Sequence, residues 1–156
     1  SAGTSIGLND ATQTLNFTDA QLDTIQTANL LIGSATQTAG ISVGTDGGGQ
    51  ISLDENLTLL TAGSISVSGG LSVDGTNTLL LDAGNDIAIT GTVATANGTL
   101  RLLADDDVTL GGFALVTSTA GNILVQADAN GDANGTGGGI TMTDGARIVA
   151  GAGTMT

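Results

Sequence analysis

Short pairs of apolar residues recur along the chain at a step of about 22 residues, separated by Gly, Asn and Asp. The pair Leu57/Leu59 returns at nearly equal steps as Leu79/Leu81, Leu100/Leu102 and Ile123/Val125. A second series runs through Ile65/Val67, Ile87/Ile89 and Val108/Leu110 and, after one insertion, Ile140/Met142. A third and weaker series runs from Leu71/Val73 to Val93, Leu115 and Ile148. This periodicity indicates a repeat protein with three strands in each repeat.

The two residues of each pair stand two positions apart, which is the period of a strand with one buried face. No segment between the strands is long enough for the helix of a crossover connection. Successive turns of the chain can instead stack in parallel at a rise of roughly 4.8 Å. We therefore predict an all-β fold, a parallel β-solenoid wound as a right-handed β-helix with a triangular section. Four side chains in the middle of the series are expected to point inward: Leu81, Ile87, Leu102 and Val108.

Composition agrees with one narrow solenoid domain over residues 1–156. Hydrophobic residues make up 40% of the chain, while Phe17 and Phe113 are its only aromatic residues. A solenoid interior holds one layer of aliphatic side chains per coil, and a large ring would force neighbouring coils apart. The 26 glycines suit corners, and the absence of proline suits strands that pair on both sides.

Residues 15–27 break the repeat and predict a short helix near the N-terminus. Thr18 followed by Gln21 forms a capping box, and Phe17 with Leu22 forms a hydrophobic staple. We expect two helical turns from Asp19 to about Gln26, as a decoration that covers the edge or side of the solenoid.

Charge and residue types exclude several function classes. Fifteen acidic residues against two arginines give a net charge of −13, which argues against binding to nucleic acid or to an anionic membrane surface. The chain has no Cys and no His, so thiolate zinc sites and His-based catalysis are excluded. We find no signal peptide and no run of 18 apolar residues, so direct membrane insertion is not expected.

One segment has the residue types of a metal site, within a polar insertion at 127–139. Asp128, Asn130, Asp132 and Asn134 place oxygen-bearing side chains at every second position, as in the first part of an EF-hand Ca²⁺ loop. The closing acid of such a loop is absent, because Gly139 stands in its place. The alternative interpretation is a polar loop built from good turn formers. A second acidic group, residues 105–107, is better explained as a solvated corner.

Three stretches, residues 15–33, 79–93 and 127–156, resemble very large secreted bacterial proteins of the filamentous haemagglutinin type. The resemblance implies a long β-helix exported across the outer membrane, acting as an adhesin or matrix protein. The secretion domain and membrane anchor typical of such proteins are not recognised in the sequence. We therefore expect a piece of a longer rod, or a subunit that associates head to tail.

Parallel β-helices also include polysaccharide lyases and hydrolases, which is the alternative function. Their sites use paired carboxylates with Lys or Arg and aromatic residues for sugar stacking. This chain has only Arg101 and Arg147 as basic residues and no Trp or Tyr, so we do not expect an enzyme. Ice binding needs a regular Thr-x-Thr array, and Thr141 with Thr143 forms such a pair only once. The sequence predicts a structural extracellular rod of a bacterial adhesin, fibre or surface matrix.

Overall fold

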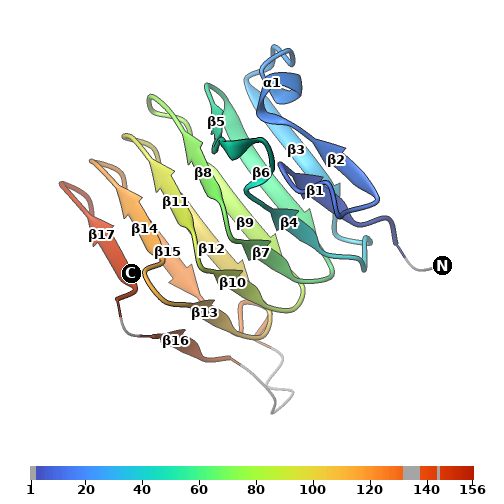
Figure 1. Cartoon of the computed structure of the whole chain (residues 1–156). Coiled ribbons are helices and arrows are strands. Elements are labelled where there is room, and N and C mark those ends of the chain that lie inside the picture. The colour runs from blue at the N-terminus through green and yellow to red at the C-terminus, as the bar shows by residue number, and fades with distance from the viewer. Residues whose placement is uncertain (1–2, 132–137, 144) are drawn as a thin grey trace.

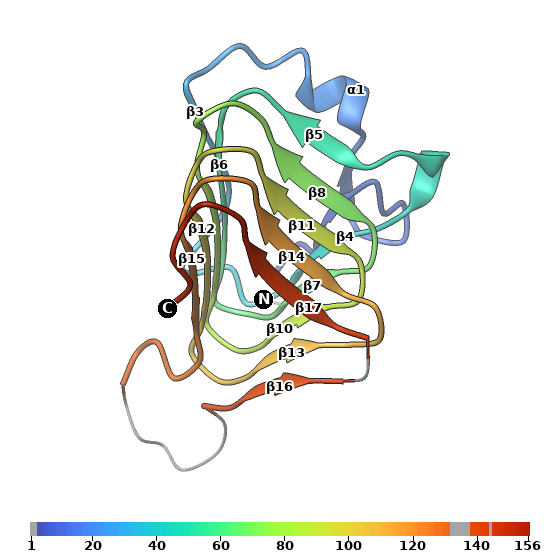
Figure 2. The same ribbon diagram turned by 90° about the vertical axis from the view of Figure 1, so that its left-hand side faces the viewer.

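The computed structural model describes residues 3–131, 138–143 and 145–156. It is an all-β parallel solenoid, as the repeat predicts, with strands stacked along one axis (Figure 1). Viewed nearly along that axis, three sheets form the sides of a triangle (Figure 2). Each coil passes through the sheets in the same order, which we call A, C and B.

The strands of each sheet follow one another in space from the C-terminal end of the solenoid to the N-terminal end. Sheet A contains β16 (Ile140–Met142), β13 (Val108–Leu110), β10 (Ile87–Ile89), β7 (Ile65–Val67), β4 (Ile41–Val43), β1 (Ile6–Leu8) and β2 (Leu15–Phe17). Sheet C contains β17 (Arg147–Ala150), β14 (Leu115–Ser118), β11 (Thr92–Thr95), β8 (Gly70–Val73) and β5 (Ile51–Leu53). Sheet B contains β15 (Ile123–Gln126), β12 (Leu100–Ala104), β9 (Leu79–Ala83), β6 (Asn56–Thr61) and β3 (Asn29–Ser34). Helix α1 (Asp19–Leu22) and the 3₁₀ turn η1 (Asp46–Gly48) complete the elements.

Strand register confirms the first two apolar series and corrects the third. Leu57, Leu79, Leu100 and Ile123 pair in succession in sheet B, and Ile65, Ile87, Val108 and Ile140 do so in sheet A. In sheet C, however, Val93 pairs with Val116 and not with Leu115, and Val116 then pairs with Ile148. The prediction for Leu115 was wrong by one residue, which places its side chain on the opposite face of the strand.

The interior is a continuous column of aliphatic side chains. The four residues expected inside, Leu81, Ile87, Leu102 and Val108, are all fully buried. Both aromatic residues lie outside the column: Phe113 is 86% exposed, and Phe17 is only partly buried against the core. The column therefore consists of small and medium-sized apolar residues in every described coil.

Glycine is required where coils approach each other most closely. A Cβ atom added at Gly91 would overlap the carbonyl oxygen of Gly69 in the preceding coil. At another corner, a Cβ atom added at Gly121 would overlap the carbonyl oxygen of Gly98. The glycine-rich composition is thus explained by backbone-to-backbone packing at the corners.

The N-terminal end differs from the regular coils. Strand β1 pairs with both β4 and β2, and sheet A has seven strands where each of the other two sheets has five. Helix α1 contacts β5, the terminal strand of sheet C, and therefore covers that sheet edge. The side chain of Thr18 accepts the Gln21 N–H and the Gln21 side chain accepts the Thr18 N–H, as the capping box predicts.

The helix is shorter than predicted. It ends at Leu22, whereas the predicted span runs from Asp19 to about Gln26. After Leu22 the backbone tightens: Thr24 N–H donates to Gln21 O at 3.3 Å and Ile25 N–H donates to Leu22 O at 2.8 Å. In each of these hydrogen bonds the acceptor is the carbonyl three residues earlier, which is the pattern of a 3₁₀ turn. This turn ends the regular α-helix.

Asn9 joins the parts of this end. Its backbone has a φ of 50°, and its side chain is 4% exposed. The side-chain amide donates to Gly49 O at 3.2 Å, while Asn9 Oδ1 accepts the N–H of Asp19 at 3.2 Å. Asn9 therefore connects the β1–β2 loop, the start of α1 and the segment after η1.

The C-terminal coil begins later in the sequence than the repeat predicts, but its strands still pair in register with the preceding coil. Thr154 N–H donates to the side chain of Asn122, which lies 32 residues earlier in the chain. The Thr117 hydroxyl donates to Val149 O across the same separation of 32 residues. The extra residues fall between β15 and β16, where the polar insertion was predicted at 127–139. The solenoid thus resumes in register after the insertion, with β16, β17 and Met155 each paired to the preceding coil.

Candidate functional site

Aspartates line the corner between sheets B and A and connect successive coils. Asp107 N–H donates to Asp86 Oδ1 at 3.2 Å, and Gly139 N–H donates to Asp107 Oδ1 at 2.8 Å. Asp105, Asp106 and Asp107 are all partly exposed, in agreement with a solvated corner. Carboxylates at this corner therefore act as acceptors for the backbone of the next coil.

The predicted calcium segment begins beside this acidic corner. Asp128 has a φ of 52°, its N–H donates to Asp106 O at 3.2 Å, and its carbonyl accepts the Gly131 N–H at 3.1 Å. Asn130 lies within this turn, whereas Asp132 and Asn134 lie outside the described residues. Among the described residues, no three acidic side chains gather in a way that could hold a metal ion. Calcium binding by the whole segment stays a prediction.

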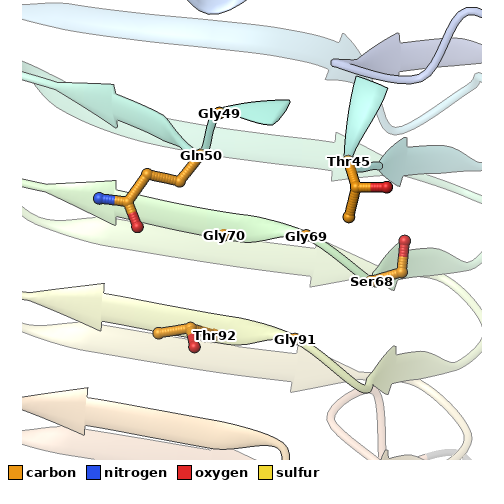
Figure 3. A pocket seen from close by; sticks show the side chains of 8 residues that line it. All are labelled: Thr45, Gly49, Gln50, Ser68, Gly69, Gly70, Gly91 and Thr92. Carbon is orange, nitrogen blue, oxygen red and sulfur yellow. The ribbon is translucent and has the colours of Figure 1, made fainter. Parts of the chain in front are cut away.

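A shallow groove of about 400 Å³ lies along the corner between sheets A and C. Figure 3 shows glycines on its floor and the side chains of Gln50, Ser68 and Thr92 beside them. The Ser68 hydroxyl donates to Val43 O at 3.3 Å. The groove is lined by Thr45, Gly49, Gln50, Ser68, Gly69, Gly70, Gly91 and Thr92. None of these side chains titrates, so the groove offers hydrogen bonds but no general acid or base.

This groove was not predicted from the sequence, although a signal for it was present. Gly69 and Gly91 stand one repeat apart and occupy the same corner in successive coils. A glycine that recurs at the repeat length indicates a place where side chains are excluded and a surface hollow can form.

A second hollow, of about 250 Å³, lies at the N-terminal end and is apolar. Leu15 and Phe17 of β2, Leu22 of α1 and Leu30 of β3 contribute to its wall. Both residues of the predicted hydrophobic staple thus face the same hollow. The full lining is Ile6, Leu15, Phe17, Leu22, Ile25, Leu30, Leu31, Ile32 and Gly33.

Large exposed hydrophobic side chains concentrate at the two ends of the solenoid. Among the described residues there are seven, and only Phe113 lies at a corner along the side. The N-terminal end exposes Leu15, Ile25 and Leu31, and the C-terminal coil exposes Ile140, Met142 and Met155. β16 and β17 are also the last strands of their sheets in the described part of the chain. The ends are therefore where apolar surface remains to be covered.

Comparisons of this chain with protein families, with curated proteins and with solved structures found no match. No helix within the described ranges has the length and apolar character needed to cross a membrane.

Proposed function

We propose that this chain is a structural β-solenoid segment of an extracellular bacterial fibre, adhesin or surface matrix protein. The observation that carries the proposal is the uninterrupted aliphatic column, which reaches both ends and is exposed there. Such a column stabilises a stiff rod, because each coil buries its apolar residues only against its neighbours. The proposed extracellular location rests on the resemblance of residues 15–33, 79–93 and 127–156 to large secreted adhesins.

The rod extends, in this proposal, by contacts at its ends. Met142 and Met155 in the last coil are 45% and 57% exposed, while Leu15 in the first is 43% exposed. Covering these side chains with another coil removes apolar surface from water. That coil belongs either to a second copy or to the same long chain. A head-to-tail contact joins two different surfaces and does not close, so it produces filaments.

Electron microscopy and light scattering test this end-to-end association on the 156-residue chain. We expect the scattering mass to rise with concentration and filaments to form. Met142→Asp with Met155→Asp, or Leu15→Asp with Ile25→Asp, should prevent the growth by placing charge on one end. Phe113→Asp is the matched control, because Phe113 is exposed but lies at a side corner. A monomer at every concentration, with amides of the last coil protected from exchange, would contradict the proposal.

A further inference from the structure

The outward face of sheet B differs from the outward faces of the other two sheets. Alternate residues in β6, β9 and β12 are buried, so the residues between them point outward. In sheet A one outward row in mutual register is Ser42, Ser66, Ala88, Thr109 and Thr141. In sheet C the corresponding row is Ser52, Ser72, Ala94, Thr117 and Val149. Sheet B instead presents five leucines, which we call the leucine face: Leu31, Leu60, Leu80, Leu103 and Leu124.

The leucines form a staggered pattern across the five strands. Leu80 lies between Thr58 and Arg101, and Leu103 lies between Asp82 and Gln126. Leu31 is 59% exposed, and the other four are partly exposed. Five strands spaced roughly 4.8 Å apart and about five residues long cover on the order of 400 Å². This area includes the polar side chains between the leucines, and the largest surface patch of a typical monomer has a similar size and is often functional.

Charge on the leucine face indicates which partner fits it. The whole chain carries −13, so two copies repel each other over most of their surface. The five strands of sheet B, however, carry only Asp82 and Arg101, and their charges cancel. These residues lie on adjacent strands, because Arg101 pairs with Leu80 and Asp82 pairs with Leu103. A second copy therefore meets a neutral face with one charge of each sign.

The surroundings of Asp82 agree with a face that is already partly dehydrated. Burial raises the pKa of this carboxyl and the nearby Asp105 raises it further, while Arg101 lowers it. An additional positive charge from a partner would favour the ionised form of Asp82.

We propose that the leucine face binds the leucine face of a second copy, with Arg101 of each copy reaching Asp82 of the other. The contact is self-complementary, as a two-fold interface requires. The sheets lie face to face about 10 Å apart, a distance that an arginine side chain can span to a neighbouring strand. This lateral contact is independent of the end-to-end contact proposed above. It gives side-by-side pairs of rods.

The contact is weak for a single segment. Two faces bury on the order of 800 Å² in total, which is below the range of stable complexes. The apolar face repeats with each coil, so longer rods carrying it add contacts and gain avidity.

Sedimentation velocity on the 156-residue chain tests the leucine contribution, in a background carrying Met142→Asp and Met155→Asp to suppress end contacts. We expect dimers to appear between roughly 10 µM and 1 mM, in the weak part of the affinity scale. Leu80→Ser with Leu103→Ser should weaken association at least about tenfold. Leu115→Ser is the matched control, because Leu115 is a partly exposed outward leucine of sheet C. Circular dichroism verifies that each variant is folded.

A charge-reversal experiment tests the pairing itself. Arg101→Asp leaves two negative charges on the face, and Asp82→Arg leaves two positive charges, so each variant alone should be monomeric. An equimolar mixture restores both opposite-charge contacts and should form heterodimers. The lateral proposal is overturned by a background protein that stays monomeric up to about 1 mM, the upper end of the expected range. Dimers indifferent to the leucine substitutions overturn it too, as does a mixture that stays monomeric. None of these results bears on the separate proposal that the unsubstituted chain associates end to end.

Discussion

The Asp19 carboxylate accepts a hydrogen bond from the backbone N–H of Ser52, with 2.9 Å between Oδ1 and N. Ser52 lies in β5, the terminal strand of sheet C, where another strand would supply a carbonyl oxygen. A side chain of a one-turn helix thus takes the place of a neighbouring strand at this sheet edge. Unpaired strand edges are templates for pairing with other chains, and α1 blocks this one, so an end-to-end contact at this end uses the edges of β2 in sheet A and β3 in sheet B.

Asp19→Ala should destabilise the first coil by about 1 to 2 kcal/mol, because the Ser52 N–H loses its acceptor. Hydrogen exchange at the Ser52 amide reports the loss locally, and thermal unfolding reports it globally. Asp23→Ala is the control, since Asp23 lies exposed at the end of the same helix. Equal protection of the Ser52 amide in both variants would show that the carboxylate is not needed.

The core should respond very differently to two adjacent leucines. Leu102 is fully buried in the column, whereas Leu103 points outward from the same strand. Leu102→Ala should lower the free energy of unfolding by about 2 to 5 kcal/mol through lost burial and a cavity. Leu103→Ala should change it by roughly 0.5 kcal/mol or less, as expected for a surface position. Urea unfolding monitored by circular dichroism compares them, and similar losses would contradict the register of sheet B.

Gly121→Ala should be destabilising by about 1 to 3 kcal/mol, the range for overpacking a tight contact. The added methyl group would overlap the Gly98 carbonyl in the preceding coil. Gly112→Ala is a matched control, because a Cβ atom there meets nothing within 4 Å. Melting temperatures of the two variants give the comparison, and a Gly121→Ala protein as stable as the control would refute the close approach.

Asp10 should make stability depend on pH in acid. Hydrogen bonds from Ser42, then Thr12 and Gln13, lower its pKa from 3.8 to about 2 despite partial burial. A carboxyl whose folded pKa is lowered stabilises the fold above pH 3.8, and this contribution disappears as pH falls through about 2. Asp10→Asn should therefore be less stable than the parent at neutral pH, and the difference should disappear as pH falls below about 2.

Asp82→Asn should change the stability in the opposite direction to Asp10→Asn, because the folded pKa of Asp82 is raised above 3.8. Its ionisation costs stability once pH exceeds the folded pKa, and no cost remains below pH 3.8. The substitution should thus stabilise the protein at neutral pH and lose its advantage in acid. Thermal melts across pH on both variants, at concentrations where the chain is monomeric, check these signs.

Calcium binding is predicted for the segment that contains Asp128, Asn130, Asp132 and Asn134. Isothermal titration at millimolar Ca²⁺, within the range of extracellular calcium modules, should detect binding that Asp128→Ala weakens. Asp23→Ala should leave the titration unchanged, since Asp23 lies at the opposite end of the solenoid. A flat titration of the parent chain would leave this segment a polar loop.

The middle coils could be predicted because their step is nearly constant, and the first coil could not because its steps vary. The step from Ile51 to its partner Leu71 is shorter than the regular repeat, whereas the step from Leu30 to its partner Leu57 is longer. Unequal corner lengths hide these pairs from a search for one fixed period. The strands remain in register nonetheless, because pairing depends on the strands and not on the corners.

The error at Leu115 has a local cause. Ala114 N–H donates to Gly111 O at 2.9 Å, closing a turn in which Phe113 has a φ of 61°. Gly111 and Gly112 do mark a turn, but a bulky residue seldom adopts a positive φ, so the part that Phe113 takes in the turn was not indicated. In the next coil Ala146 N–H donates to Thr143 O at 3.0 Å, and Gly145, with a φ of 87°, occupies the same position. The candidate surfaces were equally hidden, because the leucine face emerges only once the strands of sheet B are aligned.

All the pairs that join the last coil to the preceding one span the same longer stretch of sequence. The length of the polypeptide and the height of the rod are therefore different quantities. The insertion after β15 lengthens the polypeptide without adding a coil: beyond it sheets A and C each gain one strand, and sheet B gains the single bridge between Ile123 and Met155. The height of such a rod therefore depends on the number of stacked coils and not on the number of residues. It also follows that this corner should accept foreign sequence as a graft, whereas a single residue added within β12 would turn the side chains in the rest of that strand to the wrong face.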